Sequence, residues 1–572
     1  MLKKSLAALA VASFVMPLQA AKIKDVTLKQ VGRYATGVFD DGAAEIVAYD
    51  PATARLFVIN ASANTVDILD LSEPSDPSPW GVIDVTVLET MDDDIEMGEV
   101  GGVNGVAVSK NGLVGVAVEN DDKQAPGWAA FFDVDGTYLN HVQAGSLPDA
   151  ITFTPNSSFA LTSNEGEPND FYTVDPEGSI TVVDLRDGVL NATAAHADFT
   201  AFNTLAELPE GMRAPRWAEN SGFSLAQDLE PEFIATSHDS RTAWVTLQEN
   251  NGLAVVDIRS ATVTDLVGLG KKNHMEAGNG LDASNRDDAI NIQPWPVLGT
   301  YMPDSIFSYR TRGKTYLVTA NEGDGREYGY DIGENGNPID CLPPFEDDDG
   351  FCIVYTDEAR VKDVDLDTAV FPDPTLQEDE NLGRIKMLNT EGNLDDDNEY
   401  EEIHTFGARS ISIWRPDGTR VFDSGDTMEQ VTAAALTDMG CINSGEDVED
   451  CSDFNSTNDE NQSFDNRSDD KGPEPEGVVV GKVKGRYYAF VGLERVGGIM
   501  VFDVTQPEST RYVDYINNRD FSVEDVEEED AGDLGPEGLV FIKADDSPTG
   551  VPLLVVGNEV SGSTTIYEVL SE

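Results

Sequence analysis

The sequence predicts an all-β protein, a seven-bladed β-propeller closed by an N-terminal strand. Three observations lead to this fold. A unit of three short apolar strands recurs seven times along the 572 residues, the last unit ends without a fourth strand, and one unassigned strand precedes the first unit. Small antiparallel sheets cannot each bury both faces alone, but packed radially they can. A pair of β-sandwiches or a β-helix would use the same strands and is the alternative.

Each unit begins with a polar residue, usually an acid, that leads into an apolar strand rich in β-branched residues. Proline or glycine lies beside most of these polar residues, which is typical of a turn that opens a strand. The seven positions are Glu45, Asn104, Asp149, Glu232, Asp304, Glu476 and Glu537.

A second apolar strand comes about 15 to 20 residues later, a repeat spacing that fits propeller blades. A third strand then completes the unit, so each unit predicts an antiparallel meander. The second strands end in Asn, Glu or both, at Asn60, Glu119, Asn164-Glu165, Glu249, Asn321-Glu322, Glu494 and Asn558-Glu559.

The two ends of the chain complement each other. The last unit stops after its third strand near residues 568–570, and the strand at 26–34 belongs to no unit. If these strands pair, the last sheet gains its outer strand and no long edge stays open. We therefore expect one propeller over residues 22–572, with long loop insertions at about 326–406 in the fifth blade and at about 440–472 after it. The Asn/Ser/Asp-rich stretch 455–466 is expected to be mobile.

Residues 1–20 combine two lysines, an apolar run and small residues at a plausible cleavage point, which predicts a secretory signal peptide. We expect an exported protein, periplasmic or extracellular, with no membrane span and no C-terminal anchor. With 37 Lys+Arg against 106 Asp+Glu, the formal net charge is -69. This charge makes nucleic acid and anionic membranes poor partners, and by itself it indicates high solubility or adaptation to salt.

The four cysteines form two close pairs in the sequence, Cys341 with Cys352 and Cys441 with Cys451. In an oxidising compartment, each pair predicts a local disulfide. Zinc binding is the alternative, but neither pair has the short gap of a zinc knuckle and the whole chain has only five His.

The start of a first strand and the end of a second strand are neighbours in an antiparallel hairpin, so the recurring acids should gather at one mouth of the central channel. Gathered carboxylates raise one another's pKa unless a cation lies among them. Ca²⁺, which takes six to eight oxygen ligands, is the expected ion, and another divalent cation or iron is the alternative. The expected ligands are Glu45, Asp149, Glu165, Glu232, Asp304, Glu322, Asp324, Glu476, Glu494, Glu537 and Glu559.

Turn formation is the simpler explanation for many of these residues, because Gly permits positive φ and Asn or Asp caps turns. It explains less well three enlarged clusters, at residues 164–170, 321–327 and 471–477, in which several acids stand where one turn residue would suffice. We therefore expect a single cation site built from a few blades rather than a symmetric ring of equal ligands.

Seven longer strings carry a family resemblance: LTSNEGEPNDF (161–171), GLDASNRDDAINI (280–292), YMPDSIFSY (301–309), YLVTANEGDGREY (316–328), GARSISIW (407–414), KGPEPEGVVVG (471–481) and LGPEGLVF (534–541). Over nearly the whole mature chain, the sequence resembles the choice-of-anchor I family of secreted bacterial proteins. Members are similar to mesenchyme-specific cell-surface glycoproteins, and some relatives are described as atypical alkaline phosphatases with a distant likeness to propeller phytases. The resemblance implies a propeller and, less directly, a phosphatase.

The function expected on this basis is a secreted metal-dependent phosphoesterase acting on a small phosphate ester. Cations would polarise phosphoryl oxygens and activate water, while an arginine offsets the developing charge. No Gly-x-Ser-x-Gly motif is present, which disfavours a covalent serine mechanism. The residues expected to carry the reaction are Arg326, Arg495, Glu476 and Asp304, and Lys471, Arg519 and His238 are expected within reach of the same mouth.

The alternative is a non-catalytic propeller, in which Ca²⁺ stiffens loops and the mouth binds an extracellular protein or glycan. Propellers carry both kinds of function, so the fold does not choose between them.

Overall fold

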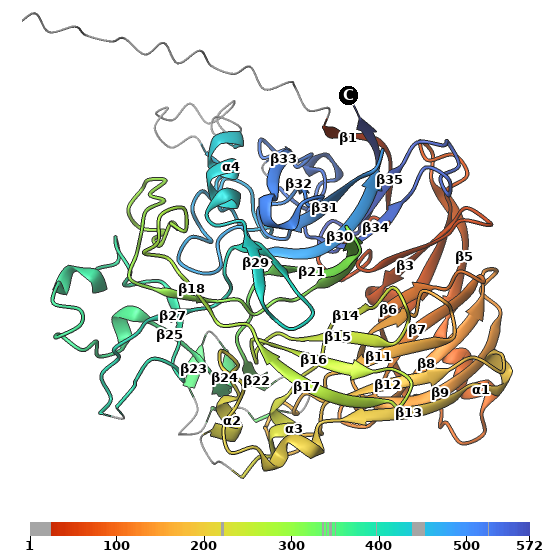
Figure 1. Cartoon of the computed structure of the whole chain (residues 1–572), viewed down its shortest axis with the longest axis horizontal. Coiled ribbons are helices and arrows are strands. Elements are labelled where there is room, and N and C mark those ends of the chain that lie inside the picture. Colours follow the sequence, from red (N-terminus) through yellow and green to blue (C-terminus); the bar gives the residue numbers. More distant parts are fainter. Residues whose placement is uncertain are drawn as a thin grey trace, which may run out of the picture.

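Figure 1 shows the computed structural model, which describes residues 25–218, 222–333, 337–338, 340–341, 346–348, 350–395, 397–436, 452–523 and 525–571. The expected signal peptide and the Cys441–Cys451 pair lie outside the described residues. Strands dominate, in agreement with an all-β fold. The α-helices of the described residues are short: α1 (Leu88–Met91), α2 (Pro215–Ala218), α3 (Leu225–Asp228) and α4 (Thr427–Ala435).

Seven four-stranded sheets form the body of the described chain, and neighbouring strands in each pair antiparallel. The first three are β2 (Val47–Asp50), β3 (Arg55–Asn60), β4 (Thr65–Asp70) and β5 (Ser78–Asp84); β6 (Val100–Val108), β7 (Leu113–Asn120), β8 (Pro126–Asp133) and β9 (Tyr138–Ser146); and β10 (Pro148–Phe153), β11 (Phe159–Asn164), β12 (Ser179–Asp184) and β13 (Thr193–Asp198).

The next two sheets are β14 (Ile234–Thr236), β15 (Thr242–Leu247), β16 (Gly252–Asp257) and β17 (Thr262–Gly268); and β20 (Ile306–Thr311), β21 (Lys314–Asn321), β28 (Ser410–Trp414) and β29 (Arg420–Asp423). The last two are β30 (Pro475–Val483), β31 (Arg486–Leu493), β32 (Ile499–Asp503) and β33 (Arg511–Ile516); and β34 (Pro536–Ile542), β35 (Leu553–Asn558), β36 (Ser563–Ser571) and β1 (Val26–Ala35). Every predicted three-strand unit is therefore present, with a fourth strand added outside it.

The N-terminal strand β1 is the outer strand of the last sheet. It pairs antiparallel with β36, from Val26 opposite Ser571 to Ala35 opposite Ser563, with one irregularity between Gln30 and Gly32. The two ends of the described chain thus share one sheet, and Figure 1 shows β1 beside the C-terminus.

Hydrophobic side chains fill the space between the faces of neighbouring sheets. Ile59 of β3 belongs to one buried core with Val116 of β7, and Leu161 of β11 belongs to another with Val245 of β15. The first and last sheets share a core as well, around Leu56 of β3. Sheets that bury their faces against their neighbours in this radial way make a β-propeller.

The insertion between β21 and β28 contains sheets of its own, where the sequence predicted only loops. β25 (Glu358–Arg360), β26 (Lys386–Leu388) and β27 (His404–Thr405) join β18 (Lys271–Asn273) and β19 (Leu298–Thr300) in a five-stranded sheet. β22 (Glu327–Asp331), β24 (Phe351–Thr356) and β23 (Glu346–Asp348) form a three-stranded sheet. These strands are short, and β19 comes from the connection before β20, so no local pattern in the sequence indicated their pairing.

Two further expectations about the insertions have different outcomes. Cys341 and Cys352 form the predicted disulfide, with Cα atoms 5.4 Å apart. The expectation of mobility at 455–466 is wrong: Asn455 and Asn458 are at most 1% exposed, and Asn461 donates hydrogen bonds to two backbone oxygens of the 520–523 loop. Polar composition suggested solvent exposure, whereas these polar side chains are buried and bonded. Among the described residues, no helix has the length and apolar character needed to cross a membrane.

Candidate metal centre

A cavity of about 310 Å³ lies among the first strands of the seven sheets, with walls from β2, β6, β10, β14, β30, β34 and the residues before β20. The glycines of the Pro-Glu-Gly motifs let these strands approach one another. A Cβ on Gly477 would collide with the backbone oxygen of Glu537, and a Cβ on Gly538 would lie 2.5 Å from that of Glu45. Close packing, rather than the positive φ suggested by the sequence, is therefore what requires glycine here.

Six half-buried carboxylates surround the mouth of this cavity, one at the start of every first strand except β6. Asn104 takes that place on β6 and donates to the backbone oxygen of Pro148 at 3.0 Å. Three of the carboxylates line the cavity itself, and the other three adjoin residues that do. The six are Glu45, Asp149, Glu232, Asp304, Glu476 and Glu537.

Electrostatic interactions link these carboxylates from sheet to sheet. Burial, followed by the Glu559 and Asp149 carboxylates, raises the pKa of Glu45 to about 8. Burial, followed by Glu45 and Glu559, holds the pKa of Glu537 well above its usual range. Burial also raises the pKa of Asp304 well above its usual range, and Asp149 adds to this shift from two sheets away. The structure thus brings the acids that begin the first strands together at one mouth.

Within the described chain, several carboxylate oxygens of the six and of the nearby Glu249 have no hydrogen-bond donor. Among the described residues, one carboxylate oxygen on each of Glu232, Glu249, Glu476 and Glu537 is buried and accepts no hydrogen bond. None of the six mouth carboxylates forms an ion pair with a lysine or arginine in this part of the chain. Buried acceptors without donors are rare in proteins, and a bound cation satisfies them.

The asparagines at the ends of the second strands have a structural role. Nδ2 of Asn164 donates to Thr181 Oγ1 at 3.0 Å on the neighbouring strand, and Nδ2 of Asn321 donates to Ser412 Oγ at the same distance. Nδ2 of Asn558 donates both to the backbone oxygen and to Oγ of Ser563 on β36. These side chains tie the second strand to the third, so for Asn the simpler explanation from turn and hairpin formation is sufficient.

The glutamates at the same strand ends include a triad with its own cations. Glu322, Glu474 and Glu494, called the mouth triad below, place one carboxylate oxygen each within 4.8 Å of the others. Lys471 Nζ lies 2.7 Å from Glu322 Oε1 and also contacts Asp324, which is 56% exposed in its side chain. Around the other two glutamates, the ion pairs are Arg467 with Glu474 at 2.8 Å and Arg495 with Glu494 at 2.9 Å.

The sequence prediction did not include Glu474 among the site residues, although the doubled Pro-Glu of residues 473–476 was a signal for it.

Arg326 is buried in ion pairs. Its Nη1 lies 2.6 Å from Asp228 Oδ1, its Nε lies 2.8 Å from Glu230 Oε2, and its Nη2 donates to the backbone oxygen of Asp228. A phosphate group could reach this guanidinium only by displacing one of these acids. Sequence reasoning missed both partners, although residues 228–232 (DLEPE) carry another acid-Pro-acid pattern.

The remaining predicted residues lie at different distances from the mouth. Burial, followed by Asp149, raises the pKa of Glu165 well above its usual range, and burial raises that of Glu559. Arg519 is buried and donates to Asn461 and to the backbone oxygen of Arg495. His238 is exposed and follows the far end of β14, opposite Glu232, so the expectation that it reaches the mouth is wrong.

The fold and the site together define a β-propeller with an acidic mouth. The chain belongs to the choice-of-anchor I family, whose domain matches residues 45–507. It is similar to gigasin-3a of Magallana gigas, with 31% identity over 204 residues that make up 34% of this chain and 67% of gigasin-3a. It is also similar to the mesenchyme-specific cell surface glycoprotein of Strongylocentrotus purpuratus, with 30% identity over 305 residues. That match covers 50% of this chain but only 36% of the glycoprotein.

Solved structures align over most of the chain at low identity. A hydrazine synthase chain of Kuenenia stuttgartiensis aligns over 94% of this chain and all of its own length, with a TM-score of 0.44 and 12% identity. A streptogramin B lyase aligns over 96% of this chain and 98% of its own length, with a TM-score of 0.40 and 10% identity.

Proposed function

We propose that this chain is an extracellular propeller whose mouth binds Ca²⁺ or another hard divalent cation. The observation that carries the proposal is the ring of six carboxylates at the starts of the first strands, three of which have a buried, unpartnered oxygen and none of which has a basic partner among the described residues. Because Ca²⁺ binds through six to eight oxygens with flexible geometry, carboxylates that arrive from several sheets suit it.

The proposed architecture is one ring of seven blades over residues 22–572, closed by β1 and preceded by a signal peptide. The pairing of β1 with β36 and the core shared by the first and last sheets support it. A closed ring fixes the distances among the six carboxylates, because each first strand is held by a sheet on either side.

The proposed ligands fall into two groups. The six mouth carboxylates, with Glu165 and Glu559 beside them, form no ion pair with a lysine or arginine among the described residues and are the first choice, although the charge of Arg495 acts on Glu559. Glu322, Asp324 and Glu494 are bound to Lys471 or Arg495, so a cation reaches them only if these ion pairs rearrange. Iron is a weaker candidate, because these oxygen donors provide none of the nitrogen or sulfur ligands that usually select it.

An extracellular location is part of the proposal. One relative is named a cell surface glycoprotein, and the Cys341–Cys352 disulfide suits an oxidising compartment. Millimolar Ca²⁺ is common outside cells, and extracellular modules are typically tuned to that range.

A phosphoesterase is the second candidate function, and one observation favours it. Arg495 is 29% exposed in its side chain and lies beside the mouth triad, so its guanidinium is accessible to a phosphate ester. In this version, cations held by Glu476 and Asp304 would polarise the phosphoryl oxygens, and Arg495 would contact them directly. Arg326 would act only through its field, because its donors are occupied by Asp228 and Glu230.

The test is direct cation binding by the mature chain after treatment with a chelator. Calorimetric titration with Ca²⁺, Mg²⁺, Mn²⁺ and Fe²⁺ should show Ca²⁺ binding that falls at least tenfold in Glu537→Gln and Glu476→Gln. The matched control is Glu73→Gln, an exposed glutamate away from the mouth, which should bind like the wild type. Equal Ca²⁺ affinity in all four proteins would contradict the mouth site.

The catalytic version needs a separate assay. A chromogenic phosphomonoester and a diester are offered at alkaline pH to the Ca²⁺-loaded and the chelated protein. Ca²⁺-dependent turnover that Arg495→Gln lowers at least a hundredfold, with Ca²⁺ binding unchanged, would support it. Ca²⁺ binding without turnover on either substrate, under any of the metals, would leave the non-catalytic propeller as the function.

A further inference from the structure

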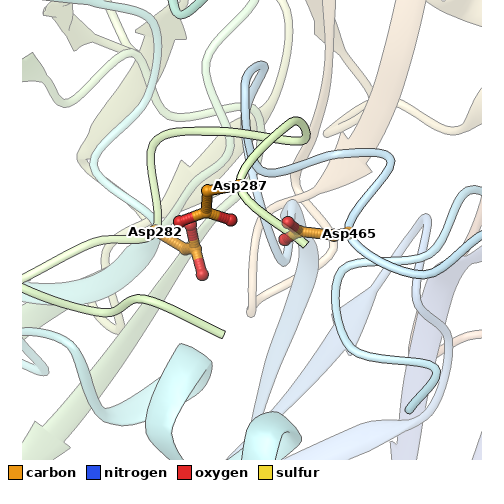
Figure 2. Close-up of side chains that lie close together, drawn as sticks. All are labelled: Asp282, Asp287 and Asp465. Carbon is orange, nitrogen blue, oxygen red and sulfur yellow. The ribbon is translucent and has the colours of Figure 1, made fainter. Parts of the chain in front are cut away.

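A second group of carboxylates lies away from the mouth, between two connections that leave the propeller. Asp282 and Asp287 belong to the loop 281–293, which the backbone pairing of Leu281 with Gln293 closes, and Asp465 belongs to the segment 452–470 before β30. Figure 2 shows the three side chains close together across the two segments. One oxygen of each lies within 4.8 Å of the others. These three residues are called the loop triad below.

The loop triad is withdrawn from water, with one route left open. Asp282 is fully buried and Asp465 is 2% exposed, whereas Asp287 is half-buried and gives access from solvent. Burial, followed by the Asp282 carboxylate, raises the pKa of Asp465 to about 9. Burial also raises the pKa of Asp282 to about 7.

The groups that donate hydrogen bonds to the three carboxylates of the loop triad are all neutral among the described residues. The backbone N–H of Asn291 donates to Asp282, its side-chain amide donates to Asp287 at 3.1 Å, and Ser468 Oγ donates to Asp465. In the described chain, no lysine or arginine pairs with any of the three carboxylates.

Arg409 is close to the loop triad but already engaged. Its Nη1 donates to the backbone oxygen of Asp282 at 2.7 Å and to Glu429 Oε1 at 2.6 Å, and its Nη2 donates to the backbone oxygens of Ser468 and Asp470. Glu429 and the backbone oxygens therefore already balance its positive charge.

Two oxygens at this place have no partner, and they point to a ligand independently of the acidic composition. Oδ2 of Asp465 is buried and accepts no hydrogen bond within the described residues, and the same holds for Oδ1 of Asn455, whose side chain is fully buried. The amide of Asn455 donates to Ser468 Oγ, which in turn donates to Asp465, so the two unpartnered oxygens belong to one hydrogen-bonded group. A buried amide oxygen without a donor is a typical neutral Ca²⁺ ligand.

We propose that Asp282, Asp287 and Asp465 bind one Ca²⁺ ion that clamps the loop 281–293 to the segment 452–470. Two Ca–O bonds of 2.3–2.6 Å span at most about 5 Å, so three oxygens within 4.8 Å of one another can ligate a single ion. Asn455 Oδ1 and solvent at the Asp287 side are available to complete the coordination. All of these donors are oxygens, which favours Ca²⁺ over zinc.

This site is separate from the mouth in both structure and role. The mouth ligands lie on the first strands of the blades, whereas the loop triad joins two insertions that the propeller does not hold together by its own sheets. Its ion would therefore order the insertions, whatever the mouth binds.

The experiment counts Ca²⁺ ions per chain on the full mature protein, by calorimetry and by elemental analysis after gel filtration. Asp287→Asn and Asp465→Asn should each bind one Ca²⁺ fewer than the wild type, and Glu537→Gln should retain the ion of the loop triad. The matched control is Asp397→Asn, an exposed residue of the acidic trio Asp395, Asp397 and Glu401, which should bind as many Ca²⁺ ions as the wild type. If the mouth binds no Ca²⁺, Glu537→Gln will bind as many ions as the wild type, while Asp287→Asn will still bind one fewer.

Hydrogen exchange gives a readout of the clamp itself. In the wild type, Ca²⁺ should slow amide exchange in both 281–293 and 452–470, and in Asp287→Asn it should slow neither. Asp287 is the decisive position if Asp465→Asn fails to fold, because its half-buried side chain tolerates an amide. Equal Ca²⁺ counts and equal protection in the wild type and Asp287→Asn would overturn the proposal.

Discussion

The mouth triad and the loop triad each consist of three closely spaced carboxylates, yet their negative charges are balanced in different ways. Each places three carboxylate oxygens within 4.8 Å of one another and buries most of the group. In the mouth triad, every glutamate has a basic partner from the chain. In the loop triad, the partners are neutral, and two buried oxygens, one on Asp465 and one on the adjacent Asn455, have no partner within the described residues.

The difference shows that acidic clustering alone does not identify a cation site. Three carboxylates with three basic side chains form a network that is complete without an ion, and such a network stabilises or orders what surrounds it. Three carboxylates whose donors are all neutral have no charge partner to offset their mutual repulsion, so they have capacity left for an external cation. We therefore expect the two triads to respond in opposite ways to the loss of a protein cation and to the removal of Ca²⁺.

The largest effect is expected from Lys471→Met, which removes the ammonium from the mouth triad. Lys471 contacts Glu322, Asp324 and Glu474, and its loss leaves buried carboxylates without their charge partner. Breaking a buried ion pair from one side typically costs about 3–5 kcal/mol. The measurement is the free energy of unfolding in denaturant at a fixed Ca²⁺ concentration.

The matched control for this change is Lys110→Met, an exposed lysine on the turn between β6 and β7. It should unfold at nearly the same denaturant concentration as the wild type, since surface substitutions usually change stability by about 0.5 kcal/mol or less. If Lys471→Met were no less stable than this control, the mouth triad would not depend on its internal cation, and the contrast with the loop triad would disappear.

The next effect in size is the stabilisation of the loop triad by Ca²⁺. An ion that binds only the folded state at 100 times its dissociation constant adds about 2.7 kcal/mol to the free energy of unfolding. Chelation should therefore destabilise the wild type by about this amount for each occupied site. In Asp465→Asn, Ca²⁺ should no longer add the part of the free energy of unfolding that comes from the loop triad. Without Ca²⁺, this variant should be at least as stable as the wild type, because an amide has replaced a buried carboxylate that has no charge partner among the described residues. A chelated Asp465→Asn that is clearly less stable than the chelated wild type would contradict this explanation.

The propeller fold was predictable because its signal repeats. Seven copies of one strand pattern constrain each other, and the acids at the strand starts could be placed at one mouth from hairpin geometry alone. The pairing of the strand at 26–34 with the last unit was also predictable, because an unassigned strand and an incomplete sheet lay at opposite ends of the sequence. The sequence had no comparable repeat for the insertions.

The loop triad and the ion pairs could not be derived from the sequence, since each joins segments that are far apart in it. The string at 280–292 suggested the family but no site, because its partner Asp465 comes from a stretch that the polar composition made us expect to be mobile. In the same way, nothing local to Arg326 indicated that Asp228 and Glu230 would occupy its guanidinium. A residue's charge can be read from the sequence, but whether that charge is already paired cannot.

A smaller effect is expected from Gly477→Ala, which tests how the mouth carboxylates are positioned. The new Cβ would meet the backbone oxygen of Glu537, so the first strands β30 and β34 would have to separate. Overpacking of this kind typically costs about 1–3 kcal/mol. The control is Gly81→Ala on the outer strand β5, where the nearest atom to a Cβ lies at 3.8 Å. Unfolding in denaturant should show a loss for Gly477→Ala beyond that of the control, together with weaker Ca²⁺ binding at the mouth and an unchanged loop triad.

The smallest effect is expected at Asp397, in an acidic trio with a different surrounding. Asp395, Asp397 and Glu401 meet the same 4.8 Å spacing as the two triads, but Asp395 and Asp397 are exposed and water screens their charges. Asp397→Asn should therefore leave the number of bound Ca²⁺ ions and the midpoint of thermal unfolding unchanged within error. If Asp397→Asn removed an ion as Asp465→Asn is expected to, spacing alone would be enough to bind Ca²⁺. The unpartnered buried oxygens, which separate the loop triad from the mouth triad and from this exposed group, would then have no bearing on where this protein binds its cations.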